Sequence, residues 1–214
     1  MFENLTDKPV IDRSPINSKS ASESGSSAKL ICRALGTPNV TFTWKREGVV
    51  IENNPENGKY VLEPSEQLNV ISYESVLLVN DVKSSDYGSY DCIARNTLGF
   101  DAMSIVLNRT SKPDLPRMLR VANITSGSVS LKWIAGFDGG IVQSFRIRYR
   151  SINDADKNPS YYYRDVFPPN STTTTITGLR ENVEYVFSVM SHNLKGDSGF
   201  TAEIVKAKTL KGKI

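Results

Sequence analysis

Residues that could support catalysis or bind a metal are scarce in this chain. Its 214 residues include two cysteines, Cys32 and Cys92, and one histidine, His192. His192 lies between two residues expected to point inward from a strand, so its ring should face solvent, and no second histidine or cysteine stands near it to complete a metal site. A lone exposed histidine and scattered carboxylates do not supply the nucleophile, base and orienting group that catalysis needs. We therefore predict that the protein is not an enzyme and has no catalytic residue, metal site or cofactor.

Asparagine sequons are the most numerous candidate modification sites. The motif Asn-x-Ser/Thr, without an intervening proline, occurs at Asn4, Asn39, Asn108, Asn123 and Asn170, each in an expected loop or strand end. One such tripeptide often arises by chance, but five favour passage through the secretory pathway, where this motif accepts N-linked glycan. We predict glycosylation at these positions. Glycan on Asn39 or Asn108 would matter most, because it would block a surface or restrict a domain junction.

Three arginines form the strongest candidate for a binding surface. Arg146, Arg148 and Arg150 alternate with apolar residues, which would place their guanidinium groups on one outward face of a strand, with Arg164 as a further member on a neighbouring strand. Such a row of charge attracts polyanions, so it could bind heparan sulfate or an acidic partner. The alternative is a solvated strand face that protects a sheet edge from pairing. We prefer the alternative, because short charge runs are usually only solvated.

An aromatic run follows the arginines. Tyr161-Tyr162-Tyr163 could present a contact surface. Alternation along a strand would instead bury Tyr162 or its neighbours. We favour burial of these rings.

Composition and length limit the remaining possibilities. A net charge of +3 is too small to indicate nucleic-acid binding, and 214 residues suit two domains. No window approaches about 18 consecutive apolar residues, so we expect no membrane span. Met1–Asn4 lacks the basic and apolar regions of a secretory signal. Together with the sequons, this suggests a piece of a larger extracellular protein whose signal, anchor and other domains are missing.

The first half of the chain carries a recognisable spacing of Cys, Trp and Tyr. Trp44 follows Cys32 by twelve residues, and Cys92 ends the run Asp86-Tyr87-Gly88-Ser89-Tyr90-Asp91-Cys92. This pattern resembles the signature of an immunoglobulin domain. The resemblance implies a disulfide between Cys32 and Cys92 across two packed sheets, with Trp44 beside it. It also implies that the Tyr90 hydroxyl reaches back to the turn before its strand.

The limits of this domain follow from alternating apolar residues. Strands are expected around residues 28–34, 41–45 and 90–94, and a hairpin at 96–99 should lead into the last strand. The hairpin and the spacing of the cysteines resemble the I-set of immunoglobulin domains found in adhesion molecules. We assign residues 8–108 to this domain. Asp86 is expected to pair with a basic residue such as Lys59.

The second half has no cysteine and a different strand pattern. Residues 109–116 form a short linker whose two prolines should limit bending. Residues 117–210 resemble a fibronectin type III domain, because Trp133 has the position of its core tryptophan and Leu179 precedes Tyr185 at the spacing of its tyrosine corner. We therefore predict an all-β chain. It should consist of two tandem antiparallel β-sandwiches, an I-set immunoglobulin domain followed by a fibronectin type III domain.

Three stretches of the second half carry a more specific resemblance. They are Gly136–Gly140, Asp165–Pro169 and Asn193–Gly199. Together they resemble the single fibronectin domain next to the membrane in the nephrin family of immunoglobulin-superfamily adhesion receptors, which includes invertebrate receptors of synaptic partner recognition. The order of the two domains is also that of this family.

The resemblance implies a function outside the cell. The family recognises Neph-type immunoglobulin receptors on an apposed cell, through more N-terminal domains that this chain does not contain. The chain is thus expected to be a membrane-proximal stalk in the extracellular part of a single-pass plasma-membrane protein at cell–cell contacts. No partner-contact residue can be transferred to it, although self-association in cis or binding of heparan sulfate remains open.

Two alternatives have the same domain types. The chain could be an intracellular structural module of a sarcomeric protein, or an ectodomain piece of a receptor phosphatase or kinase. The paired cysteines and the sequons argue against the first, because an intracellular filament has no reason to accumulate them. Only a longer chain would distinguish the second from a nephrin-like receptor.

Overall fold

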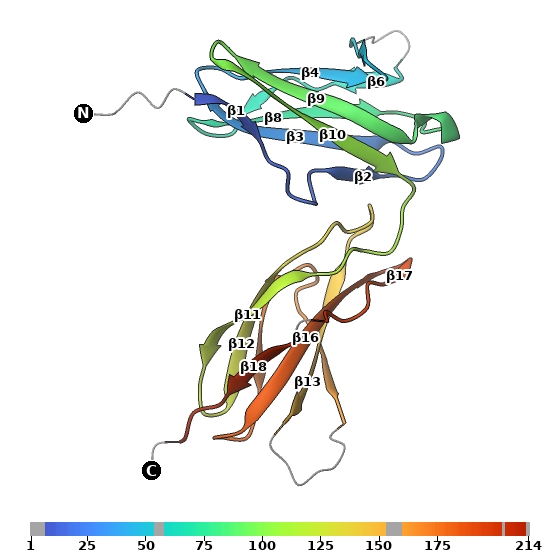
Figure 1. Ribbon diagram of the computed structural model, residues 1–214. Helices are drawn as coiled ribbons and strands as arrows, with labels where there is room; N and C mark the ends of the chain where they lie inside the picture. The colour runs from blue at the N-terminus through green and yellow to red at the C-terminus, as the bar shows by residue number, and fades with distance from the viewer. Residues whose placement is uncertain (1–6, 54–57, 153–159, 203, 213–214) are drawn as a thin grey trace, which may run out of the picture. The chain divides into compact units, whose positions relative to one another are not determined.

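The protein consists of two β-sandwich units. A computed structural model describes residues 7–53, 58–152, 160–202 and 204–212. The chain divides into the units Met1–Thr110 and Ser111–Ile214, and each is described by itself (Figure 1). Within the described residues the only helix is one short 3-10 turn, η1 (Ser84–Asp86). The predicted all-β class is therefore confirmed.

The first unit packs one sheet against another. One sheet has the order β1 (Asp7–Ile11), β3 (Ala28–Thr37), β8 (Ser72–Val79) and β6 (Tyr60–Leu62), with β7 (Glu66–Gln67) also paired to β8. The other has the order β2 (Lys19–Ala21), β10 (Gly99–Asn108), β9 (Gly88–Asn96), β4 (Thr41–Arg46) and β5 (Val49–Val50). The pairing of β10 with β2 is parallel, whereas the other pairs are antiparallel. The N-terminal segment of the unit thus contributes β1 to one sheet and β2 to the other.

The core of the first unit forms because alternate residues of β3 and β9 point inward. Cys32 and Cys92 are joined by a disulfide between the two sheets. Trp44 is buried, and its Nε1 donates a hydrogen bond of 3.0 Å to Ser75 Oγ. The Tyr90 hydroxyl donates a 2.9 Å bond to the Asp86 carbonyl, which fixes the turn that leads into β9.

The second unit also has two sheets. One has the order β11 (Arg117–Ile124), β12 (Ser128–Ile134) and β15 (Thr173–Thr177). The other has the order β14 (Tyr162–Asp165), β13 (Ser144–Ser151), β16 (Glu184–Asn193) and β17 (Gly196–Asp197), and β18 (Val205–Lys208) also pairs with β16. We call this second one the large sheet of the second unit.

Aromatic residues fill the core of the second unit. Trp133 of β12 meets Phe145 of β13 edge to face, with ring centroids 5.4 Å apart. Tyr185 accepts a 3.0 Å hydrogen bond from the Arg180 backbone N–H at its hydroxyl, which closes the corner before β16. Neither unit shares core residues with the other, because each hydrophobic cluster is confined to its own sandwich.

Candidate functional site: a linker clamp and an arginine–aromatic face

The described sequons all lie on the surface. Asn4 is outside the described residues, whereas the side chains of Asn39, Asn108, Asn123 and Asn170 are exposed. Asn123 pairs with Ser130 on the outward face of the sheet of β11, β12 and β15, which we call the small sheet of the second unit. Asn170 occupies the turn between β14 and β15 with a φ of 69°. All four are therefore accessible to a glycosyltransferase, and their glycosylation stays a prediction.

Asp86 is the most enclosed charged group of the first unit. Its Oδ1 lies 3.3 Å from Arg46 Nη1, and its Oδ2 accepts hydrogen bonds from Lys59 Nζ and from the Lys83 backbone N–H. Burial opposes the charged form, but the bonds from these donors outweigh it, so the pKa of Asp86 lies below its ordinary value. This arrangement has the character of a structural ion pair.

The linker is bound to the second unit by a set of hydrogen bonds. The Ser111 backbone N–H donates to the Gly139 carbonyl at 3.0 Å, and the Asp114 backbone N–H donates to the Phe137 carbonyl at 2.8 Å. Asn193 Nδ2 donates to the Ser111 carbonyl at 2.8 Å. In addition, Ser191 Oγ donates to the Asp114 carbonyl at 2.7 Å. We call this set the linker clamp.

Two glycines allow the linker to approach so closely. A Cβ added to Gly139 would lie 2.0 Å from the Ser111 carbonyl oxygen, and the φ of this residue is +74°. A Cβ on Gly136 would lie 2.8 Å from the Leu115 carbonyl oxygen. Side chains at these positions would therefore displace the linker. The stretches Gly136–Gly140 and Asn193–Gly199, which carry the more specific sequence resemblance, thus meet at the clamp.

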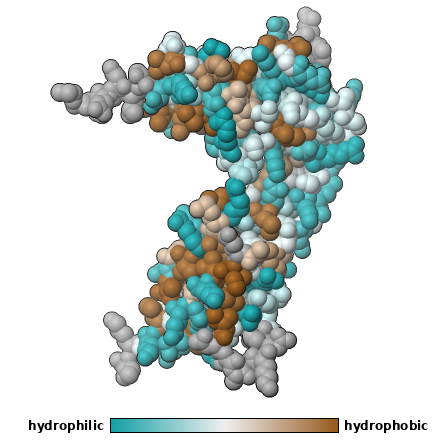
Figure 2. All heavy atoms as spheres, viewed as in Figure 1, coloured by the Kyte–Doolittle hydropathy of each residue, from teal (hydrophilic) through white to brown (hydrophobic). Residues whose placement is uncertain are grey.

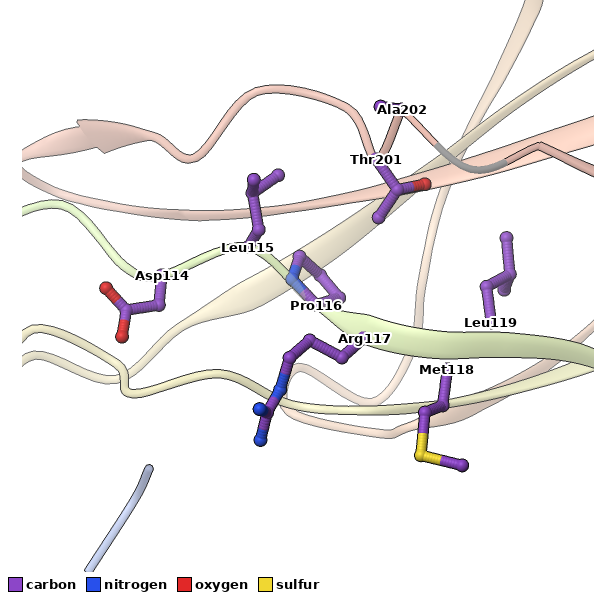
Figure 3. A pocket seen from close by; sticks show the side chains of 8 residues that line it. All are labelled: Asp114, Leu115, Pro116, Arg117, Met118, Leu119, Thr201 and Ala202. Carbon is purple, nitrogen blue, oxygen red and sulfur yellow. The ribbon is translucent and has the colours of Figure 1, made fainter. Parts of the chain in front are cut away.

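An apolar cavity of about 570 Å³ lies next to the clamp. Figure 3 shows its lining, which comes from the end of the linker, the start of β11 and the segment before β18: Asp114, Leu115, Pro116, Arg117, Met118, Leu119, Thr201 and Ala202. Figure 2 shows apolar residues gathered on this side of the second unit. The lining combines one carboxylate and one guanidinium with mostly apolar groups, so it suits an apolar side chain better than a chemical reaction.

The three arginines of β13 do not form a uniform strip. All three point outward from the large sheet, but Arg146 Nε forms an ion pair with Asp165 Oδ1 at 2.5 Å. This bond also holds the pKa of Asp165 below its ordinary value. Arg164 lies opposite Ile147 in the ladder between β13 and β14, and residues directly opposite share a face. Arg164 therefore lies on the other face of the sheet from Arg146, and its predicted place in the strip is wrong.

Tyr162 and Tyr163 are exposed and Tyr161 is only partly buried, so the expected burial of these rings is also wrong. Tyr162 is 63% exposed and Tyr163 is 54% exposed. The cause is that β14 is an edge strand of the large sheet, where an inward-pointing ring is not covered by the opposite sheet. Tyr162 instead stacks on Tyr149, with ring centroids 5.6 Å apart.

Arginine and aromatic side chains alternate across the outward face of the large sheet. The neighbours, in order, are Arg150, Tyr161, Arg148, Phe200 and Tyr163. The three distances from an arginine Cζ to the next ring centre are 5.2, 4.8 and 4.4 Å, and the centres of the Phe200 and Tyr163 rings are 6.0 Å apart. Each cation–π contact contributes about 0.5–1 kcal/mol at an exposed site. We call this row the arginine–aromatic ladder.

The ladder covers β16 from outside. Val186, Ser188 and Met190 point away from the core, yet their exposures are only 2, 1 and 5%. Arg148 Nε also donates a 2.7 Å hydrogen bond to Ser188 Oγ. Phe200 was not found from the sequence, because nothing near it in the chain indicates contact with a strand fifty residues earlier.

Within residues 7–53, 58–152, 160–202 and 204–212, no group of three His, Cys, Asp or Glu side chains could hold a metal ion. In that part of the chain no helix has the length and apolar character to cross a membrane.

Comparison with known proteins places both units in known domain families. Residues 8–96 match the immunoglobulin domain model, and residues 114–207 match the fibronectin type III domain model. Both families are structural modules, and neither indicates catalysis.

Similar proteins are cell-surface receptors. Human nephrin is 40% identical over 180 residues, which are 84% of this chain and 14% of nephrin. The human cell adhesion molecule DSCAM is 28% identical over 182 residues, covering 85% of this chain and 8% of DSCAM. The chain therefore spans only a small part of the relatives it matches. Among solved structures, domains A168–A170 from titin match with a TM-score of 0.41 and 22% identity, covering 96% of this chain and 67% of that one.

Proposed function

We propose that this chain, an immunoglobulin-superfamily segment similar to nephrin, is the membrane-proximal stalk of a cell adhesion receptor. In this proposal the receptor is a single-pass plasma-membrane protein at cell–cell contacts. It recognises Neph-type immunoglobulin receptors on the apposed cell through domains that this chain does not contain. The chain itself holds those domains away from the bilayer.

The observation that carries the proposal is the similarity to nephrin, which extends through both domains and the linker between them. A fold-level likeness would be confined to core positions such as Cys32, Trp44 and Trp133. The exposed sequons Asn39, Asn108, Asn123 and Asn170 support the extracellular location. The disulfide supports it too, because such bonds persist in oxidising compartments.

The linker clamp supports the mechanical role. Tension that enters the second unit at Ser111 passes first to the hydrogen bonds with Gly139 and Asn193. Asn193 is the last residue of β16, a central strand of the large sheet, and Gly139 lies in the loop that leads from β12 to β13. Load is therefore distributed into the sheet at once, which is what a stalk under tension between cells requires.

A cell aggregation assay tests the proposal. Cells that express the full-length receptor are mixed with cells that express a Neph-type receptor. The residues of this chain are then replaced by an unrelated immunoglobulin–fibronectin pair of similar length. A stalk predicts that aggregation survives the replacement, and that the isolated chain does not bind the Neph-type ectodomain.

Two outcomes would contradict this function. Direct binding of the isolated chain to the Neph-type ectodomain would make it a recognition domain. Unmodified asparagines and two free thiols in the secreted chain, measured by intact mass before and after glycan removal, would remove the extracellular location.

A further inference from the structure

The positive charge of the protein is concentrated in the second unit. Residues 1–110 contain 11 Lys and Arg and 14 Asp and Glu, whereas residues 111–214 contain 15 and 9. The first unit thus carries a formal charge of −3 and the second +6. A polyanion is therefore attracted to the second unit and repelled by the first.

Strand register gathers part of this charge on the outward face of the large sheet. Arg150 lies opposite Val186 of β16, and Val186 lies opposite Lys206 of β18. Lys208 lies opposite Glu184, one row further along the same face. With Arg148, the four side chains form a patch that spans three strands. We call Arg148, Arg150, Lys206 and Lys208 the basic face.

Few acidic groups compensate the basic face. Among the described residues, no ion pair involves Arg150, Lys206 or Lys208, and Arg148 bonds to the neutral hydroxyl of Ser188. Glu184 is the one carboxylate whose strand position falls within the patch. Arg146 differs, because Asp165 neutralises it at the other end of β13.

Aromatic contacts hold two of these cations in place. Arg148 and Arg150 lie at 4.8 and 5.2 Å from the centre of the Tyr161 ring, and Phe200 lies at 4.4 Å from Arg148. Arginine side chains normally lose rotamer entropy when they bind a ligand. Because Tyr161 already orders both, binding here costs less than at free surface arginines.

The described sequons of the second unit leave this face open. Asn123 points outward from the opposite sheet, beside Ser130, and Asn170 lies in the turn after β14. Another exposed basic group, formed by Arg117, Arg120 and Lys132, shares the outward face of the small sheet with Asn123. Glycan on Asn123 would stand over that group, whereas none of these sequons lies on a strand of the large sheet.

We propose that the basic face binds a linear sulfated polysaccharide of the heparan sulfate type. Arg150 and Lys206 are two strand spacings apart, roughly 10 Å, so they cannot converge on one phosphate headgroup. Cations on β13 and β18, with β16 between them, instead match a ligand whose negative charges repeat along a chain. This interaction goes beyond the stalk function and does not depend on the receptor's partner.

The test compares two triple variants of the secreted chain with equal net charge. Arg150→Ala/Lys206→Ala/Lys208→Ala removes three charges from the basic face, and Arg117→Ala/Arg120→Ala/Lys132→Ala removes three from the small sheet. Binding to immobilised heparin is measured at physiological ionic strength by surface plasmon resonance. We expect the first variant to bind about 100-fold more weakly, since each basic residue near an anionic surface contributes about fivefold. The second should remain within about fivefold of the unmodified protein.

A third variant separates an ordered site from charge alone. Tyr161→Leu keeps every charge but removes the ring between Arg148 and Arg150, so binding should weaken about fivefold. Thermal unfolding of each variant verifies that the second unit is folded.

Three outcomes would overturn the proposal. The first is no binding of the unmodified chain to heparin at physiological ionic strength. The second is an equal loss for both triple variants, which would mean that net charge alone is responsible. The third is binding to phosphatidylserine vesicles without binding to heparin, which would assign the face to a membrane surface.

Discussion

At the scale of single residues, Asp101 connects the first strand of the chain to the last strand of its unit. Its carboxylate accepts hydrogen bonds of 2.8 and 2.6 Å from Arg13 and one of 2.9 Å from the Ile11 backbone N–H. These bonds stand where the chain leaves β1 and crosses to the sheet that contains β2 and β10. The bonds from Arg13 outweigh partial burial and lower the pKa of Asp101 to about 2.

We expect Asp101→Asn to reduce stability in a pH-dependent way. A depressed pKa stabilises the folded state above the ordinary value of 3.8, and this contribution is lost as pH falls toward 2. Because Arg13 is half exposed, we expect the substitution to lower the free energy of unfolding by only about 1 kcal/mol at pH 7. Urea unfolding of both proteins at pH 7 and near pH 2 measures the difference. An equal difference at both pH values would contradict an ionic origin.

Residue types and spacing predicted well those side chains that are fixed by one local pattern. Cys32, Cys92 and Trp44 lie together between the sheets, and Tyr90 bonds back to the turn before β9. Alternation failed for Tyr162, because alternation states which side of a strand a residue takes and not whether anything covers that side. Arg164 failed for a related reason, since its face depends on the register with β13.

At the scale of elements, the clamp makes Gly139 far more sensitive than an ordinary turn glycine. Gly139→Ala would place Cβ against the Ser111 carbonyl, in addition to the strain of a φ of +74°. Gly178 has the same φ of +74° and nothing within 4 Å, so Gly178→Ala is a matched control for strain alone. We expect the free energy of unfolding to fall by about 1 kcal/mol in the control and by at least about 3 kcal/mol in Gly139→Ala, as measured by denaturant unfolding. Equal losses would mean that the linker contact adds nothing.

The arginine–aromatic ladder should require arginine and not merely a cation. Arg148→Lys keeps the charge but loses the planar stacking between Tyr161 and Phe200 and the bond to Ser188. We expect a loss of about 1–2 kcal/mol in the second unit. Arg164→Lys, on the other face, should change stability by less than about 0.5 kcal/mol. If Arg148→Lys left the free energy of unfolding unchanged, the ladder would not contribute to the stability of the second unit.

Sequence analysis identified some residues of the ladder, the basic face and the linker clamp, but not the contacts that join them. Arg148 and Tyr161 were noticed, but Phe200, Lys206 and Lys208 join them only through the pairing of β13, β16 and β18. Residues 109–116 were predicted to be a short linker stiffened by its two prolines, but nothing in the sequence indicated that Ser111 and Asp114 bond to residues far along the chain. Such long-range pairing leaves no local pattern.

At the scale of the whole molecule, the two separate cores predict two unfolding transitions. Cys32→Ala/Cys92→Ala removes the disulfide from the first core only, at a cost of about 2–5 kcal/mol. Scanning calorimetry should show one transition move to lower temperature while the other remains. A joint shift of both transitions would show that the units unfold cooperatively.

The unequal charge of the units has a consequence for salt dependence. The second unit, at +6, repels itself more than the first, at −3, so added salt should raise its transition temperature more. Composition predicted only the total of +3, in which this asymmetry cancels.

Both faces of β16 are buried, so its residues should tolerate few substitutions. From Tyr185 to Ser191 every side chain is buried, because the core covers one face and the ladder covers the other. In β3, buried and more exposed positions alternate instead. Saturation mutagenesis should thus reveal β16 as an unbroken block of intolerant positions. It would resemble the centre of a sheet enclosed on both sides, although arginine and aromatic side chains of the ladder lie over its outward face.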